Sequence, residues 1–392
     1  MILDLLDALL ILIICCILSL ESTSQGPWAL NAIKNVLGIG SANLQLGGGS
    51  KLNGWFRDGQ CNYQLMKVLK TFVKANNLNQ TTTDNWSVYL PCGYNHAETE
   101  YSKIVSKDPK QKIFIIKGGD NLSRKDTLWK HLQNKYGEGA SAYMPKSYIL
   151  NDHRDIVKLN KDYNSSKVYI LKKNIQRQQG LKMTQNKKEL LQGSENGYVI
   201  AQEMLQDPFC IDGRKTNCRY YLLIMCQNGK KSGYLYNNGF MYYTPAPFKK
   251  GSMEEDRVIT AGLSTKRRDA KFYETHPLTL QDWQKQQKVD LIGSVGVLMN
   301  KILSASSPHF CTPSQLDKRV TFQLFGCDIA FNEKMQPQLI EINKGPDLSS
   351  RSEREIALKD DLIQQIFSLV GLDVVDNKGK KIEPVNLKLI WE

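Results

Sequence analysis

The sequence contains no CxxC pair among its 9 cysteines and has only 5 histidines. Zinc sites and dithiol redox motifs usually show cysteines at that spacing, so the sequence argues against both kinds of site. Several cysteines lie inside apolar, strand-like runs, where a free cysteine typically packs as a small buried hydrophobic side chain. The chemistry of this chain must therefore come from other residue types.

The N-terminus lacks an apolar run of full membrane-spanning length. The run from Ala8 to Leu20 is shorter than the roughly 20 residues that a span needs, and Asp4 and Asp7 precede it where a signal peptide carries Lys or Arg. Residues 1–24 are interpreted as an apolar signal or anchor segment, with membrane contact through residues 8–20. The alternative is a buried helix or a wrongly assigned start codon. Residues 25–53, rich in Gly, Ser and Asn, predict a linker.

Basic residues outnumber acidic ones: the chain has 52 Lys and Arg and 39 Asp and Glu, which gives a formal net charge of +13. This imbalance favours a polyanionic partner, such as nucleic acid, a membrane surface, nucleotide phosphates or an acidic protein tail. The basic residues are scattered and no RNA- or DNA-binding signature accompanies them, so a nucleic-acid partner is not expected.

The composition is that of a globular protein, with 41% hydrophobic and 23% charged residues in 392, and the length suggests two or three domains. Residues 54–150 predict a small N-terminal α/β domain, with a helix over Tyr63–Ala75, a buried strand over Lys112–Lys117 and a helix over Ser123–Gln133 capped by Ser123. Residues 151–374 predict the central and C-terminal domains, and residues 375–392 a C-terminal tail.

Periodicity places further strands and helices in residues 151–374. The expected strands are Lys167–Lys172, Gly197–Leu205 and the hairpin pair Arg219–Cys226 and Gly233–Tyr243. The expected helices are Leu280–Ser304 and Ser352–Leu369, the latter ended by Gly371. The resulting class is α/β (α+β), with antiparallel strands and flanking helices.

Two consecutive predicted strands, Phe322–Phe331 and Pro337–Asn343, carry acids among apolar residues. If Phe331 pairs with Gln338, antiparallel register places Asp328 opposite Glu341, and Asn343 falls on the same face two residues on.

Two carboxylates that face each other in a half-buried sheet repel, and a hard cation removes that cost. Mg²⁺ takes oxygen ligands and is often completed by substrate phosphates. Asp328, Glu341 and Asn343 therefore predict a magnesium site. The alternative is a pair of surface acids matched with Lys344 and Arg351, but the apolar flanking residues favour the metal.

Cationic side chains occur on other predicted strands. Lys172 ends an apolar strand, and the following loop, KNIQRQQGLK, could cover phosphates as Gly-rich loops do. Lys215, Asn217 and Arg219 alternate onto one face of a strand, and the segment GYVIAQEMLQDPF could offer backbone donors and acceptors to an adenine edge. Each of these features alone could be a solvated strand edge or loop. Together with Asp328, Glu341 and Asn343, the cations predict phosphoryl transfer from a triphosphate.

The order of these motifs resembles the tubulin–tyrosine ligase-like family, which are ATP-grasp amino acid ligases. The resemblance runs through YILK, R-x-x-GL, Q-E-x-L, RK-x-x-x-R-Y-Y-L-L, LFG-x-D and LIEIN-x-x-P-x-L, and upstream through GGDNLSRKDTLWKHL. It covers roughly Trp55 to Gly371, and the paired LFG-x-D and E-I-N motifs are its specific part. It implies an ATP-grasp fold with a smaller N-terminal domain.

The resemblance also implies roles for particular residues. Asp328, Glu341 and Asn343 would hold magnesium, while Lys215 and Arg219 would face the phosphate and the acceptor carboxylate, with Asn217 between them. The remaining nucleotide-binding positions would be Lys125, Lys172, Arg177, Gln202, Glu203, Met204 and Leu205. ATP would convert a protein carboxylate to an acyl phosphate, and the amine of a free amino acid would then form the amide bond.

Two positions and one segment depart from the family pattern. Asn217 stands where the family usually has Asp, and Gln178 stands where a second Gly is common in the phosphate loop. The H-L-T-N segment of the family is replaced by RVITAGLSTKRRDAKFYETHPLTL.

Two functions follow as hypotheses. The first is an ATP- and Mg²⁺-dependent ligase that adds an amino acid to tubulin or another acidic protein tail, by tyrosination, glutamylation or glycylation. The second, favoured by the departures, is a ligase-like nucleotide-binding protein without turnover that acts as a binding or scaffold module. The resemblance implies the cytoplasm, cytoskeleton or cilium, whereas the N-terminal apolar segment implies a membrane or the secretory pathway.

Overall fold

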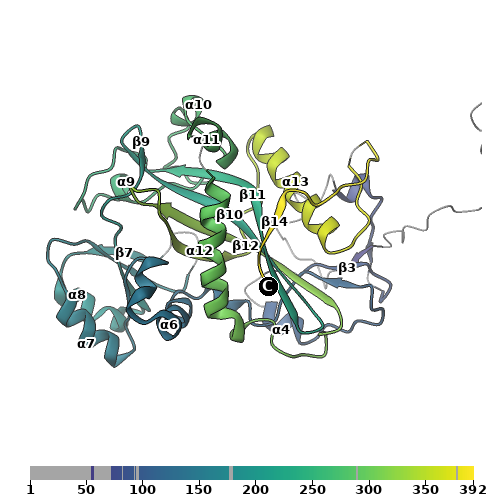
Figure 1. Ribbon diagram of the computed structural model, residues 1–392, viewed down its shortest axis with the longest axis horizontal. Helices are drawn as coiled ribbons and strands as arrows, with labels where there is room; N and C mark the ends of the chain where they lie inside the picture. The colour runs from purple at the N-terminus through teal and green to yellow at the C-terminus, as the bar shows by residue number, and fades with distance from the viewer. Residues whose placement is uncertain are drawn as a thin grey trace, which may run out of the picture. The chain divides into compact units, whose positions relative to one another are not determined.

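Two β-sheets with flanking helices form the fold in a computed structural model of the chain (Figure 1). The structure describes residues 54–56, 72–81, 83–91, 93, 97–175, 180–287, 290–376 and 378–392. The predicted α/β class, with antiparallel and mixed sheets flanked by helices, is confirmed. The expected apolar segment 8–20 and linker 25–53 lie outside the described residues. Within those residues, no helix combines the length and the apolar character that crossing a membrane requires.

The larger sheet has 10 strands in the order β14-β11-β10-β12-β4-β3-β1-β2, with β13 beside β12 and β9 beside β10. Their bounds are β1 Trp55–Phe56, β2 Gln80–Thr81, β3 Val88–Tyr89, β4 Lys112–Ile113, β9 Cys210–Ile211, β10 Arg214–Gln227, β11 Lys230–Tyr243, β12 Val320–Phe331, β13 Pro337–Lys344 and β14 Leu387–Trp391. The predicted hairpin of β10 and β11 is confirmed.

The smaller sheet has 4 strands in the order β5-β8-β6-β7. They are β5 Ser147–Ile149, β6 Tyr169–Lys172, β7 Leu181–Thr184 and β8 Ile200–Glu203. All their pairings are antiparallel.

The α-helices are α4 Ala97–Tyr101, α5 Asp120–Ser123, α6 Lys125–Tyr136, α7 His153–Asp162, α8 Lys187–Leu191, α9 Glu255–Val258, α10 Phe272–Thr275, α11 Leu280–Gln287, α12 Leu291–Ser306 and α13 Glu353–Leu369. Short 3-10 helices cover Gly137–Ala142, Gly193–Asn196 and Ser307–His309.

The large sheet is apolar on both faces because a different helix covers each. Helix α12 packs on the face that carries Tyr220 and Leu222 of β10. Helix α13 packs on the opposite face, which carries Tyr221 and Leu223. This alternation follows from the two-residue period of a strand, and Figure 1 shows α12 crossing β10, β11 and β12.

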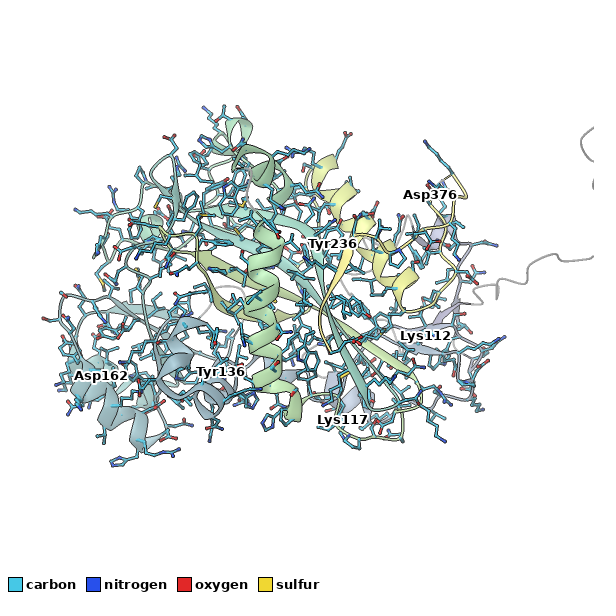
Figure 2. All side chains as sticks on the ribbon, viewed as in Figure 1. Lys112, Lys117, Tyr136, Asp162, Tyr236 and Asp376 are labelled. Atoms are coloured by element: carbon cyan, nitrogen blue, oxygen red, sulfur yellow. A yellow bond between two sulfur atoms is a disulfide. The ribbon has the colours of Figure 1, made fainter. Side chains whose placement is uncertain are left out.

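Helix α13 is fixed by its cap and by a polar contact with the sheet. Ser352 caps its N-terminus by accepting a hydrogen bond from the Glu355 amide, and Gly371 beyond its C-terminus has a φ of 84°, as predicted. The Tyr236 hydroxyl of β11, labelled in Figure 2, donates to Asp361 of α13 over 2.6 Å. The helix is therefore held firmly against its face of the sheet.

The β12–β13 hairpin contains a bulge that the sequence did not reveal. Phe331 pairs with Pro337 rather than with Gln338, so the assumed pairing is wrong by one residue. The register shifts between Asp328 and Ile329, and Asp328 nevertheless lies opposite Glu341, as predicted. One extra residue in β13 produces this outcome, as β-bulges do when they redirect side chains beside functional sites.

Several local predictions are corrected by the structure. The helix expected over Leu280–Ser304 is two helices, because Asp290 caps a new helix at Leu291. Ser123 ends α5, and α6 follows Arg124 without a side-chain cap, so Ser123 is not the predicted N-cap. The strand expected over Lys112–Lys117 is confined to Lys112–Ile113.

Two other expectations are changed by contacts between residues that lie far apart in the sequence. Cys218 and Cys327 are buried free cysteines, as expected, but Cys226 of β10 forms a disulfide with Cys311. Residues 375–392, expected as a tail, contain β14, which pairs with β11 at the edge of the large sheet. Most of the helix expected over Tyr63–Ala75 lies outside the described residues, and 72–75 are helical.

Candidate active site

The acids of the β12–β13 hairpin lie on the face of the large sheet that α13 covers. Cross-strand register places Glu341 opposite Asp328, Asp328 opposite Arg219, and Arg219 opposite Phe240. Directly opposed side chains in antiparallel strands point to the same face. An acid pair and a guanidinium therefore form one row across four strands.

Arg219 and Asp328 form a bidentate ion pair. Arg219 Nε donates to Asp328 Oδ1 over 2.6 Å, and Nη2 donates to Oδ2 over 3.1 Å. Burial raises the pKa of Asp328, and the nearby carboxylate of Glu341 raises it further, although Arg219 opposes both effects. The pair matches the fork geometry in which arginine binds carboxylates most strongly.

Glu341 is neutralised from the opposite side of the row. Its Oε2 lies 3.5 Å from Lys125 Nζ, and its Oε1 accepts a 3.0 Å hydrogen bond from Asn343 Nδ2. Burial would raise the pKa of Glu341, but the charges of Lys125 and Lys172 lower it overall. The glutamate is therefore held ionised in a largely enclosed position.

Three lysines with little solvent exposure, Lys125, Lys172 and Lys215, line the same cavity as the acids. Lys172 Nζ donates to Gln202 Oε1 over 2.6 Å, and Lys215 Nζ donates to the Val258 carbonyl over 3.0 Å. Burial lowers the pKa of both Lys172 and Lys215 to about 8. Buried ammonium groups with so few acceptors are suited to an anionic ligand.

These groups line one cavity of about 580 Å³, within the usual size range of ligand sites. Part of its wall is apolar and is formed by Ile170 and Leu181 of the small sheet, Met204 directly after β8 and Val258 at the end of α9. Of the predicted site residues, the cavity brings together Lys125, Lys172, Gln202, Glu203, Met204, Leu205, Lys215, Asn217, Arg219, Asp328, Glu341 and Asn343. Arg177 lies outside the described residues.

Two of the predicted nucleotide residues have side chains engaged within the protein. Gln202 accepts from Lys172 and donates to Ser147 Oγ over 3.0 Å. The Glu203 carboxylate pairs with Lys167 over 2.7 Å, so its side chain is directed to another charge. The contribution of this strand to a ligand would therefore come from its backbone and from the Met204 side chain.

Asn217 lies between Lys215 and Arg219 on β10, as the alternation predicts, and its Oδ1 atom is buried without a hydrogen-bond partner in the described part of the chain. Buried polar atoms are rarely left unpaired in native proteins. An unpaired acceptor in the cavity wall is a group that a ligand could satisfy.

The side chains of Asp328, Glu341 and Asn343 have the donor atoms that Mg²⁺ prefers. They comprise two carboxylates and one amide, all oxygen donors, and the two carboxylates are close enough to influence each other's pKa. The described residues contain no group of three or more His, Cys, Asp or Glu side chains that could hold a metal ion by themselves. A metal held here would therefore take few protein ligands and be completed by water or phosphate oxygens, as Mg²⁺ commonly is.

The cavity also has lining residues that the sequence patterns did not single out. Tyr221, Phe240 and Tyr242 come from β10 and β11, and Lys359 comes from α13. Lys359 is 4% exposed on the apolar side of its helix, beside Leu358 and Leu362. A lysine within an apolar helical stripe was the one sequence signal that could have identified this part of the site.

The family model described as "Tubulin-tyrosine ligase family" matches residues 104–382. Similar curated proteins include tubulin polyglutamylase ttll-4 of Caenorhabditis briggsae, 24% identical over 72% of this chain and 50% of its own length. Tubulin polyglutamylase TTLL6 of Mus musculus is 23% identical over 75% of this chain and 38% of its own length. Tubulin monoglutamylase TTLL4 of Mus musculus is 21% identical over 74% and 25%. The chain thus spans half or less of the length of these relatives.

Proposed function

Because the chain belongs to the tubulin-tyrosine ligase family, we propose that it is an ATP- and Mg²⁺-dependent ligase that joins a free amino acid to a protein carboxylate. The convergence of Asp328, Glu341 and Asn343 with buried lysines in one cavity carries the proposal. Phosphoryl transfer depends mainly on neutralising and positioning phosphate charge, which is what such a set can do.

Tubulin is the proposed protein substrate. The relatives ttll-4, TTLL6 and TTLL4 are named for tubulin glutamylation. The net charge of +13 suits an acidic protein tail, since opposite charge accelerates encounter. A tubulin substrate would place the activity at the cytoskeleton.

The proposed reaction has two steps. A carboxylate oxygen of the protein substrate takes the γ-phosphoryl group of ATP, giving an acyl phosphate and ADP. The amine of the amino acid then attacks the acyl carbon, the C–N bond forms as the C–O bond to phosphate breaks, and the amine loses a proton.

Phosphate charge would be neutralised in two ways, directly by lysines and through a bound Mg²⁺. Lys125, Lys172 and Lys215 would neutralise phosphate oxygens within the cavity. Asp328, Glu341 and Asn343 would hold Mg²⁺, which when bound supplies further charge neutralisation to the phosphates.

An apolar slot beside the lysines would receive the adenine. Ile170, Met204 and Val258 pack in one cluster and all line the cavity. Leu205, which follows the end of β8, lines the same region, and its backbone could hydrogen-bond to the base.

Affinity for ATP should weaken as pH rises through about 8. Lys172 and Lys215 have pKa values lowered to about 8 by burial, so both are charged below that pH and lose their protons above it. Each lysine that is neutral must be protonated before it can pair with a phosphate, so affinity should fall about tenfold per lysine one pH unit above the pKa. Calorimetric titration with a non-hydrolysable ATP analogue and Mg²⁺ at pH 7, 8 and 9 measures this.

The variant Lys172→Met serves as the comparison for that titration. It should bind the analogue more weakly at pH 7 and show a shallower decline towards pH 9. Equal affinity of the unmodified protein at all three pH values would contradict the assignment of these lysines to the phosphates.

The ligase proposal is tested by incubating purified protein with tubulin, ATP, Mg²⁺ and a labelled amino acid, using tyrosine, glutamate and glycine in turn. Label should enter tubulin only when ATP is present, with one ADP formed per amino acid incorporated. Absence of both label and ADP formation under these conditions would overturn the proposal.

The second candidate function is nucleotide binding without turnover. It is favoured by Asn217, whose amide cannot supply the negative charge of the Asp usual in this family, and whose Oδ1 has no partner within the described residues. Binding of the ATP analogue without label transfer or ADP formation would support this function over the ligase.

A further inference from the structure

A disulfide joins Cys226, near the end of β10, to Cys311 in the segment that follows the last 3-10 helix. The two Cα atoms are 6.1 Å apart, within the range of native disulfides, although the cysteines are 85 residues apart in the sequence. Neither cysteine lines the cavity. The proposed reaction therefore does not use this cross-link.

We propose that Cys226 and Cys311 form a reversible redox site, and that reduction of their disulfide weakens ATP binding by loosening the elements that carry Lys125. The inference rests on the proposed role of Lys125 at the nucleotide phosphates and adds a form of regulation to that site. A tubulin substrate would place the chain where glutathione keeps most thiols reduced. A disulfide in such a compartment is usually transient or redox-sensing rather than structural.

Cys311 is held against the segment that leads into α5 and α6. Its backbone N–H donates to the Lys117 carbonyl over 2.7 Å, and the Nζ atom of Lys117, a residue labelled in Figure 2, donates to the Pro313 carbonyl over 2.7 Å. A Cβ atom added at Gly118 would lie 2.4 Å from the His309 carbonyl oxygen, so the two backbones approach closely. The two segments therefore form one packed unit.

His309 connects that unit to the start of α6. Its carbonyl accepts a 2.7 Å hydrogen bond from Asn121 Nδ2 of α5, and its ring stacks on the ring of His131 in α6, with centroids 4.0 Å apart. His131 is buried on the inner side of α6. Lys125 is the first residue of that helix, and its ammonium lies 3.5 Å from the Glu341 carboxylate. The elements that carry this ammonium therefore rest on the segment that the disulfide fixes.

Of the two cysteines, Cys311 is the one that an external thiol would reach first. It is partly exposed, whereas Cys226 is 8% exposed. Lys231 lies directly opposite Cys226 on β11, and its Nζ donates to the Ser307 and Phe310 carbonyls. A neighbouring ammonium favours the thiolate, which is the reactive form of cysteine.

Glutathione and its disulfide are the class of reactant. On reduction, a glutathione thiolate attacks the Cys311 sulfur, the bond to the Cys226 sulfur breaks, and Cys226 leaves as a thiolate that takes up a proton. A second glutathione then attacks the glutathione sulfur of the mixed disulfide, which releases glutathione disulfide and the Cys311 thiol. The protein gains two electrons and two protons, all of which come from the two glutathione molecules.

Reduction should weaken ATP binding without abolishing it. The loop after β6 also holds Lys125, because the Nζ of this lysine donates to the Ile175 carbonyl over 3.2 Å. Affinity for the ATP analogue should therefore fall by about 2- to 30-fold, the range over which residues without ligand contact change binding. Backbone amides of residues 117–124 should exchange hydrogen faster after reduction, whereas those of β6 should keep their rates.

The test places the full chain in glutathione buffers that range from oxidising to reducing. Alkylation under denaturing conditions, followed by peptide mass spectrometry, should find Cys226 and Cys311 protected in oxidising buffer and both labelled in reducing buffer. Calorimetric titration with the non-hydrolysable ATP analogue and Mg²⁺ then gives the affinity of each redox state. Hydrogen exchange measured by mass spectrometry reports on residues 117–124 without any ligand.

Variants separate the cross-link from the other cysteines of the chain. The double variant Cys226→Ser with Cys311→Ser should bind the analogue with the affinity of the reduced protein in every buffer. Asn121→Ala, which removes the hydrogen bond to His309, should still form the disulfide but show a smaller difference between the redox states. Asn151→Ala, at an exposed asparagine, should keep the full difference.

The inference alone fails if the analogue binds equally well in both redox states, if both cysteines are alkylated in oxidising buffer, or if the double variant keeps a redox response. It also fails if circular dichroism shows that reduction unfolds the chain, because the disulfide would then be structural. If the analogue binds in neither redox state, the inference is overturned together with the proposed function.

Discussion

Replacing Glu341 with glutamine is expected to reduce ATP-dependent ligation by at least about 100-fold, in the range seen when one electrostatic group of an active site is lost. The substitution keeps the size of the side chain but removes one of the two charges that would hold Mg²⁺. It also leaves Lys125, 3.5 Å from the Glu341 carboxylate, without its ionic partner. The initial rate of label incorporation into tubulin, with saturating ATP and Mg²⁺, measures the loss.

A matched control is available in the same hairpin. Glu333 lies in the turn between β12 and β13 and is exposed, so Glu333→Gln should keep full activity. Both variants should show the circular dichroism spectrum of the unmodified protein. Activity of Glu341→Gln within threefold of that of Glu333→Gln would rule out Glu341 as a metal ligand.

Replacing Gly239 with alanine is expected to destabilise the protein by about 2–4 kcal/mol, as overpacking against a fixed backbone does. A Cβ atom at this position would lie 2.0 Å from the Arg219 carbonyl oxygen and 2.9 Å from Leu280 Cδ1. The clash can be relieved only by moving β11 away from β10, beside the register shift between Tyr220 and Leu222. A thermal melt should show a clear drop in Tm.

The same change should also lower activity, because Gly239 neighbours Phe240 and pairs beside Arg219, both of which line the cavity. Gly139→Ala is the control, since a Cβ there would meet nothing closer than Tyr136 Cβ at 4.0 Å. Equal Tm values for Gly239→Ala and Gly139→Ala would show that the two strands can separate without cost.

Much of the fold was predictable because it depends on local patterns. Apolar and aromatic runs of strand length identified β10 and β11, and Ser352 and Gly371 identified the limits of α13. Where a boundary depended on a single cap, prediction was weaker: Asp290 begins a second helix within an apparently continuous helical pattern. A capping signal consists of only one or two residues, whereas a helical pattern extends over many, so a cap inside such a pattern is easily missed in the sequence.

The candidate site was predictable to the extent that its residues share strands or occur in motifs of recognisable order. Asp328 and Glu341 were placed opposite each other from an assumed register that was wrong by one residue in the turn, and a bulge in β13 restored the pairing. Bulges depend on how two strands pack against the rest of the sheet, and the sequence of one hairpin does not encode them visibly.

By itself, the sequence determined the fold class, the main strands and helices, and the acids and cations of the strands that converge in the cavity, because strand alternation and helix periodicity act over a few residues. The role of Lys125 was implied only by the family resemblance. Only the tertiary structure decided that Arg219 binds Asp328, that β14 closes the edge of the sheet, and that Lys359 meets an aromatic wall formed more than one hundred residues earlier. Those contacts depend on which elements pack together, and that is decided by the summed burial of the whole chain rather than by any local pattern.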